Sequence, residues 1–262
     1  MKKWWRRIIS LFIWPVMALP VYSQTAADHI AAGDSFYAQF DDNRALEEYR
    51  KALELEPENY EALWKVARAL IDVADALPAK DPATPARQKK MYSEAEDYAR
   101  RAVKVNPDDT WGHFFLSAAM GKRALMLGKK EQIELSRKIK AEIEKAIELD
   151  PQNDLAYHAL GRWHRRMAEI GGVKRALGGL LYGDIPRGTF EESEKCFKQA
   201  IEIKPDYTNH YLELGRTYVA MGKKDLAIQA FEKCLECPVT TSKCELYKKE
   251  ASEELARLKV KK

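Results

Sequence analysis

The 262-residue chain contains little glycine, proline or cysteine. With only 13 Gly and 11 Pro, against 46% hydrophobic and 32% charged residues, it is neither collagen-like nor low-complexity, and the composition favours a helix-rich globular protein. Long alternations of apolar and polar residues, which indicate strands, are absent. The net charge of +4 equals the four basic residues of the first segment, so the rest is formally neutral. Charge therefore gives no argument for a nucleic-acid partner, and we predict none.

Patterns of catalytic and metal-binding residues are also missing. The five histidines form no HExxH motif and no zinc spacing, and His158 and His164 are too far apart to share a helix face in the way i, i+4 residues do. The Gly-Gly pairs at positions 171 and 178 lack the preceding strand and the Gly-Lys-Ser/Thr sequence of a phosphate loop. We therefore predict no catalytic residue, no metal and no cofactor.

The four cysteines all lie in the C-terminal quarter. Outside the cytosol they could pair, and the short loop between Cys237 and Cys244 makes a Cys237–Cys244 disulfide the favoured pairing. The alternative is that Cys196 and Cys234 fill small core positions as free thiols. The Cys234-x-x-Cys237 spacing has neither a second ligand pair for zinc nor the βαβ pattern of a redox site around it.

Residues 1–23 have the organisation of a secretory signal peptide. Four basic residues precede an apolar run of about 12 residues, which is shorter than the roughly 20 needed to cross a bilayer. Small or apolar residues occupy the −3 and −1 places of a cut after Ser23. We predict an exported protein, periplasmic or secreted, with an uncleaved membrane anchor as the alternative.

A pair of short helical patterns recurs along the chain. Its clearest copy, in residues 208–238, has Gly215, Tyr218, Ala227 and Phe231 at fixed offsets and closes with Pro238. This is the pattern of a tetratricopeptide helix pair of about 34 residues. Gly215 and Ala227 let two antiparallel helices approach closely, and the aromatic residues fill the seam. One pair cannot bury its apolar face alone, so neighbouring pairs must stack on it.

The same offsets divide the remainder of the chain into units. We predict an all-α, right-handed tetratricopeptide superhelix, an α-solenoid of about five helix pairs with a C-terminal capping helix. A Pro-rich insertion (77–85) expands the second unit, and a Gly-rich insertion (170–188) expands the fourth. We interpret the latter as a flexible connector or as a flap over the groove. The five units and the cap are 26–59, 60–109, 110–153, 154–207, 208–241 and 242–262.

The first helix of each unit is expected to line the concave face with basic and aromatic side chains. Arginine binds carboxylate or phosphate at two points, and aromatic faces hold an extended chain or an acyl tail. We predict a non-enzymatic scaffold that binds a protein or peptide partner of acidic character, or alternatively an anionic phospholipid. A solvated face with ion pairs to nearby acids is the plainer interpretation. The candidate partner-binding residues are Trp64, Lys65, Arg68, Trp111, Phe114, Phe115, Lys122, His158, Arg162, Arg165, Arg166 and Arg216.

Residues 92–258 also resemble a known family. The LGRW sequence at 160–163, YGDIP at 182–186 and TFEE at 189–192 resemble the helical-repeat domain of the regulator of microtubule dynamics proteins. The resemblance implies a tetratricopeptide module used for protein contacts, with some members binding phospholipid at organelle contacts. The predicted signal peptide departs from that pattern. Only the fold and the groove are therefore expected to carry over.

Overall fold

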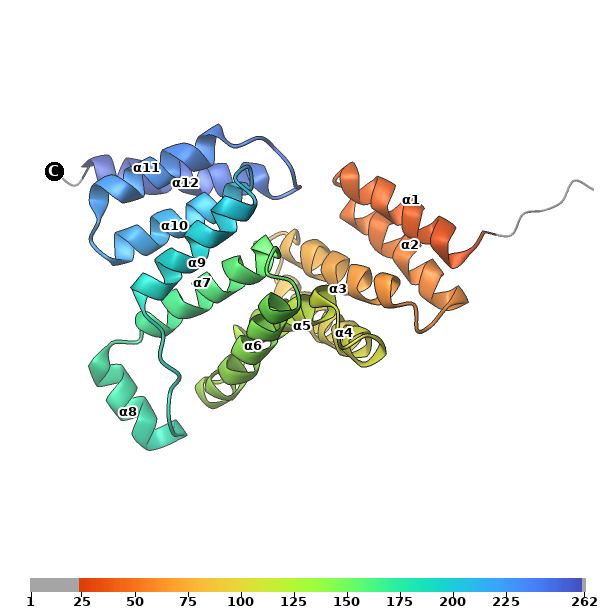
Figure 1. The fold of residues 1–262 in the computed structure, drawn as a ribbon, viewed down its shortest axis with the longest axis horizontal. Helices are drawn as coiled ribbons and strands as arrows, with labels where there is room; N and C mark the ends of the chain where they lie inside the picture. The colour runs from red at the N-terminus through yellow and green to blue at the C-terminus, as the bar shows by residue number, and fades with distance from the viewer. Residues whose placement is uncertain (1–23, 261–262) are drawn as a thin grey trace, which may run out of the picture.

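The computed structural model describes residues 24–260, and within this range it contains 12 helices and no strand. Ten of the helices form five antiparallel pairs that follow one another along a curved solenoid (Figure 1). The predicted all-α solenoid is thereby confirmed. The pairs are α1 (Ala26–Ala38) with α2 (Asp42–Leu55), α3 (Tyr60–Asp75) with α4 (Thr84–Val105), α5 (Thr110–Ala124) with α6 (Lys129–Leu149), α7 (Asp154–Ala168) with α9 (Phe190–Ile203), and α10 (Thr208–Ala220) with α11 (Lys224–Glu236).

Local sequence sets where the helices begin and end. Asn59, Asn153 and Thr189 begin α3, α7 and α9, because each side chain accepts a hydrogen bond from a backbone amide of the first turn. Proline ends the second helix of four pairs, because the residue before a proline is disfavoured in the α region. That residue has φ between −140° and −131° in each case. The four residues are Glu56, Asn106, Asp150 and Lys204.

A glycine on the first helix faces a buried aromatic ring on the second in three of the pairs. A Cβ at Gly215 would lie 2.4 Å from Phe231 Cε1, so only glycine allows the helices to approach this closely. The aromatic residues are fully buried and fill the seams between the helices. The three pairs are Gly33 with Tyr49, Gly161 with Phe197, and Gly215 with Phe231.

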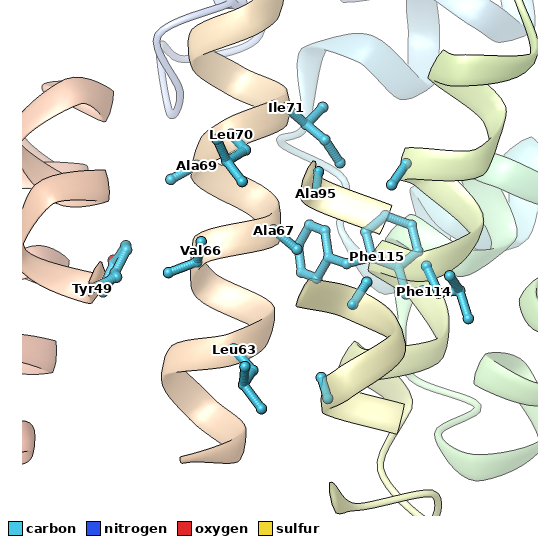
Figure 2. Packing of buried hydrophobic residues seen from close by; sticks show 14 of the residues in the cluster. Tyr49, Leu63, Val66, Ala67, Ala69, Leu70, Ile71, Ala95, Phe114 and Phe115 are labelled. Carbon is cyan, nitrogen blue, oxygen red and sulfur yellow. The ribbon is translucent and has the colours of Figure 1, made fainter. Parts of the chain in front are cut away.

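Helix α3 lies at the centre of the N-terminal core and is buried on two sides. Figure 2 shows Val66 on the side that faces Tyr49 of α2, whereas Ala67 and Ile71 point toward the α4 and α5 side, where Phe115 lies. A second core cluster, centred on Phe197 and Phe231, joins α9, α10, α11 and α12 (Cys244–Val260). Each pair therefore buries its apolar surface against the next, as stacked repeats require.

The C-terminal segment does more than cap the last pair. Helix α12 packs on α10 and α11, as a cap would, but residues 238–247 reach across the inner face to the N-terminal pairs (Figure 1). Ser242 Oγ donates to Asp42 Oδ2 at 3.0 Å, and Lys243 Nζ lies 2.7 Å from Asp72 Oδ1 and from Asp75 Oδ2. We call residues 238–247 the C-terminal strap. It joins the two ends of the solenoid.

The Gly-rich insertion differs from both interpretations of the sequence. It contains a helix, α8 (Gly172–Tyr182), rather than a structureless connector, and Figure 1 shows α8 projecting from the ends of α7 and α9. It does not lie over the inner face as a flap would. In the Pro-rich insertion, α4 already begins at Thr84 with Pro85 in its first turn, where the missing amide costs nothing.

None of the helices between residues 24 and 260 combines the length and the apolar composition that crossing a bilayer requires. The predicted signal peptide at residues 1–23 lies outside the described residues.

Candidate functional site: the inner cavity

A cavity of about 340 Å³ lies on the inner face of the solenoid. Helices α1, α3, α5, α6, α7 and α10 border it, and the strap contributes Lys243 and Tyr247. The inner face is therefore a partly closed chamber rather than an open groove. Its apolar lining includes Ile71, Phe114, Phe115, Ile139, Ile143 and Leu155.

Seven of the 12 candidate partner-binding residues line this cavity, and five do not. Helices α3, α5 and α7 contribute the lining ones, in agreement with the expectation that first helices face inward. The lining residues are Arg68, Phe114, Phe115, Lys122, His158, Arg162 and Arg166, whereas Trp64, Lys65, Trp111, Arg165 and Arg216 lie outside the lining.

Nearby acids neutralise much of the predicted positive charge. Lys65 is only 5% exposed, and its Nζ lies 2.6 Å from both Asp34 Oδ2 and Glu61 Oε1. The Arg68 guanidinium lies over the ring of Tyr37, 3.6 Å from its centroid, and donates to Tyr49 Oη at 2.9 Å. These two cations stabilise the junction of the first two pairs. These two residues therefore fit the alternative of a face with internal ion pairs better than they fit a ligand-binding site.

The strap forms a second compensated cluster. Asp75 accepts from both Lys122, at 2.6 Å, and Lys243. Burial alone would lower the pKa of Lys243, but Asp72 and Asp75 outweigh it and raise that pKa above the ordinary lysine value. The same two lysines hold the pKa of Asp75 below its usual value although burial opposes this. The cluster therefore stays charged, and it connects α3, α5 and the strap electrostatically.

Glu213 of α10 binds three arginines, two from α7 and one from α10. Arg165 forms an ion pair with it, Arg162 Nε lies 3.9 Å away, and Arg216 Nη1 donates to it at 3.0 Å. Burial would raise the pKa of Glu213, which is 4% exposed, but the positive charges of Arg162, Arg165 and Arg216 lower it to about 2. The sequence pattern did not indicate this arrangement, in which one buried carboxylate serves three guanidinium groups.

Arg166 is the basic residue of this region that keeps an uncompensated charge. Among residues 24–260, no carboxylate lies within ion-pair distance of it, and its side chain is exposed to the cavity that it lines. Burial, followed by the neighbouring Arg162 and Arg165, lowers its pKa below the ordinary arginine value. Arg166 can therefore attract an anion that enters the cavity, and Arg162 lies next to it in the lining.

His158 lies in a buried chain of polar groups at the edge of the cavity. Its Nδ1 is 3.0 Å from His210 Nδ1, and His210 Nε2 is 3.0 Å from Asp154 Oδ2. Burial lowers the pKa of His158 well below 6.5, and His210 and Arg162 lower it further, so its imidazole is neutral. Asn209, also in the lining, has a buried Oδ1 with no hydrogen-bond partner among the described residues.

The aromatic candidates form a stack that only partly belongs to the cavity. The ring centroids of Trp64 and Trp111 are 5.4 Å apart, and those of Trp64 and Phe115 are 5.5 Å apart. Phe115 continues the stack into the cavity lining, whereas both tryptophans are half-buried beside it.

The four cysteines are free and buried, so the predicted Cys237–Cys244 disulfide is not formed in the structure. Burial raises the pKa of Cys196 and of Cys234 to about 12, which suits thiols that only fill core positions. Burial opposes ionisation of Cys244 too, but hydrogen bonds from Thr208, Thr241 and Thr240 outweigh it and lower the pKa to about 7. Cys244 begins α12, so these bonds help to fix the strap.

Sequence reasoning missed the strap residues and their partners. Lys243 and Asp75 meet across 168 residues of chain, and nothing in a repeat pattern indicates such a pairing. Tyr207 and Asn209, which also line the cavity, stand at the start of a helix whose inward face was expected to contribute only Arg216.

The five stacked pairs define a tetratricopeptide α-solenoid, here with a chamber on its inner side. A solved thermophilic tetratricopeptide protein from Thermus thermophilus superimposes with a TM-score of 0.63 at 17% identity, covering 87% of this chain and 100% of the other. At this identity the match speaks for the fold alone.

The family model described as "Regulator of microtubule dynamics protein 1-3" matches residues 29–259, and the chain belongs to this family. It is 30% identical over 245 residues to regulator of microtubule dynamics protein 1 of Mus musculus, covering 91% of this chain and 79% of the relative. The Bos taurus protein is 32% identical over 199 residues, with coverages of 76% and 62%. The Caenorhabditis elegans protein is 23% identical over 215 residues, with coverages of 82% and 92%.

Proposed function

We propose that this helical-repeat scaffold acts by binding rather than by catalysis, and that its inner cavity takes an acidic amphiphile. Such a ligand has an apolar chain and a carboxylate or phosphate head, as an anionic lipid does. The observation that carries the proposal is the juxtaposition of an apolar chamber with the uncompensated Arg166 in its lining.

The dimensions of the chamber support a ligand of this kind. Its volume of about 340 Å³ lies at the lower end of the range for small-molecule sites and is too small for a long extended peptide. The strap crosses the inner face, so a peptide threading along the solenoid would have to displace Ser242 and Lys243 from their carboxylate partners. An acyl chain can lie among the phenylalanine and isoleucine side chains while Arg166 and Arg162 bind its head group at two points.

A protein or peptide partner is a second candidate, favoured by the Trp64–Trp111 stack. This pair is half-buried outside the cavity, beside Lys65 and Arg68. Aromatic residues next to an arginine often anchor protein contacts. A short segment could lie on the stack without moving the strap.

The place of action is also a proposal. The basic start, the apolar run and the small residues before position 24 support export by a cleaved signal peptide. The N-terminal sequence of the protein recovered from its source cell tests this: a first residue at or near position 24 is expected, and an intact Met1 would contradict it.

Calorimetric titration with dodecyl phosphate and with dodecyl maltoside, both below their micellar concentrations, tests the cavity proposal. Arg166→Gln is the informative variant, because changing Arg165 or Arg216 would also remove one of the partners of the buried Glu213. We expect it to weaken dodecyl phosphate binding about tenfold, from the loss of a charged hydrogen bond, and to leave the neutral surfactant unaffected.

Lys233→Gln, which alters an exposed lysine on α11, is the matched control and should bind like the unmodified protein. Equal affinity of Arg166→Gln and the control for dodecyl phosphate would reject the assignment of Arg166. Absence of binding by either surfactant would reject the cavity as an amphiphile site and favour the tryptophan stack.

A further inference from the structure

Helix α8 exposes its apolar side chains to an unusual degree. Val173 is 77% exposed, Leu177 58%, Leu180 85% and Leu181 72%. Their spacing of i, i+4, i+7 and i+8 places them along one side of the helix. No residue of α8 is buried, and no other element of residues 24–260 covers this side.

Contacts on the opposite side of α8 stabilise the helix although the ridge is not buried. Arg175 Nη1 donates to the carbonyl oxygens of Ile185, at 2.9 Å, and of Pro186, at 2.8 Å, while its Nη2 donates to Met167 at 2.6 Å. The buried side chain of Ile185 packs against the backbone at Gly178, where a Cβ would lie 2.7 Å from Ile185 Cδ1. The ridge is thus presented before any partner arrives.

Positive charge accompanies the ridge. The insertion at 170–188 carries three basic residues, Lys174, Arg175 and Arg187, against the single acid Asp184. Lys174 and Arg187 are exposed. Helix α6 adds Arg137, which is exposed and donates to the backbone oxygen of Asp184. The insertion itself is therefore net positive and favours a negatively charged partner, while the exposed acids Glu169, Glu191 and Glu192 flank it.

We propose that α8 docks the protein on the surface of an anionic lipid bilayer, with the ridge of Val173, Leu177, Leu180 and Leu181 entering the boundary of the acyl chains. A projecting ridge of aliphatic side chains needs no complementary pocket in a bilayer, and nearby cations bind acidic head groups. Figure 1 shows α8 extending away from the rest of the solenoid, so a flat surface can reach it. A second copy of the chain, which would have to match the ridge in shape, is the competing occupant.

The docking surface is independent of the cavity. None of the residues from 170 to 188 lines the cavity, so the outcome for α8 leaves the cavity proposal unaffected. The two would act together if the ligand of the cavity came from the same bilayer.

Hydrogen exchange of the full chain with and without vesicles tests the proposal and separates α8 from residues 1–23. We expect vesicles of phosphatidylcholine and phosphatidylglycerol to slow exchange in residues 172–182, and phosphatidylcholine alone to slow it less. Leu180→Gln/Leu181→Gln should remove this protection and weaken α8-dependent binding about tenfold or more, because each leucine contributes a large apolar area. Added salt should weaken the protection as well.

Leu246→Gln is the matched control, because Leu246 is 52% exposed on α12 and belongs to no part of the ridge. Circular dichroism verifies that both variants keep their helices. Protection of 172–182 that persists in Leu180→Gln/Leu181→Gln would overturn the proposal. Protection of 172–182 that increases with protein concentration in the absence of vesicles would also overturn it, because a second copy of the chain would then cover the ridge.

Discussion

At the scale of the residue, the packing of the helix pairs depends on a few close approaches. Gly33, Gly161 and Gly215 each leave room for one aromatic ring, and at Gly33 and Gly215 an added Cβ would lie within 2.4 Å of that ring. Gly121 on α5 is different, because a Cβ there would meet nothing within 4 Å. A close contact between helices therefore requires glycine at Gly215, whereas the space around Gly121 would accept a larger residue.

Gly215→Ala should lower the free energy of unfolding by about 1–3 kcal/mol, because Phe231 is fully buried and must shift to admit the methyl group. Gly121→Ala is the control and should raise it by about 0.5–1 kcal/mol, because alanine restricts the unfolded chain and favours helix. Urea unfolding of both variants measures the difference. Equal changes in the two would contradict the close-approach argument.

His158 gives stability a pH dependence. The pKa of the folded imidazole is below 6.5, so the unfolded chain takes up a proton that the folded chain resists as pH falls below that value. The free energy of unfolding should therefore decrease on acidification by up to about 1.4 kcal/mol per pH unit for this residue.

His158→Gln should make the decrease between about pH 6.5 and 5 shallower, although His210 and His164, whose pKa values are also lowered, keep part of it. Urea unfolding at several pH values measures the slope. Unfolding at about pH 8, where the imidazole is neutral in both states, provides the reference. A slope unchanged by the substitution would count against a neutral buried His158.

At the scale of the element, sequence was most informative where local chemistry decides the outcome. Helix ends before Pro57, Pro107, Pro151 and Pro205 follow from sterics within two residues. The insertion at 170–188 was harder to predict, because its six glycines suggest a loop. Helix α8 forms there because Arg175 binds three backbone oxygens supplied by the flanking segments.

At the scale of the whole molecule, the strap decides whether the inner face is a groove or a chamber. Ser242 and Lys243 join the last helix pair to α2 and α3, and Lys243 and Tyr247 form part of the cavity lining. Of the arginines predicted to face a ligand on α7 and α10, most form ion pairs with Glu213. Arg166 lines the cavity without such a partner and keeps an uncompensated charge.

Lys243→Gln should loosen the strap and lower the free energy of unfolding by about 1–3 kcal/mol, because Asp72 and Asp75 lose their shared cation in a largely buried site. Hydrogen exchange in residues 238–247 should become faster. Lys233→Gln removes only an exposed pair and should change stability by less than about 0.5 kcal/mol. Unaltered exchange in 238–247 of Lys243→Gln would show that the strap is held by other contacts.

The sequence by itself determined the helices, their pairing and the inward direction of Arg68, Lys122, Arg162 and Arg166, because these follow from periodicity, caps and prolines within a single unit of the repeat. Only the tertiary structure decided which of those charges stay uncompensated and whether the inner face is open. Those outcomes depend on partners as far apart as Asp42 and Ser242, 200 residues distant in the chain, and no local pattern records such distances.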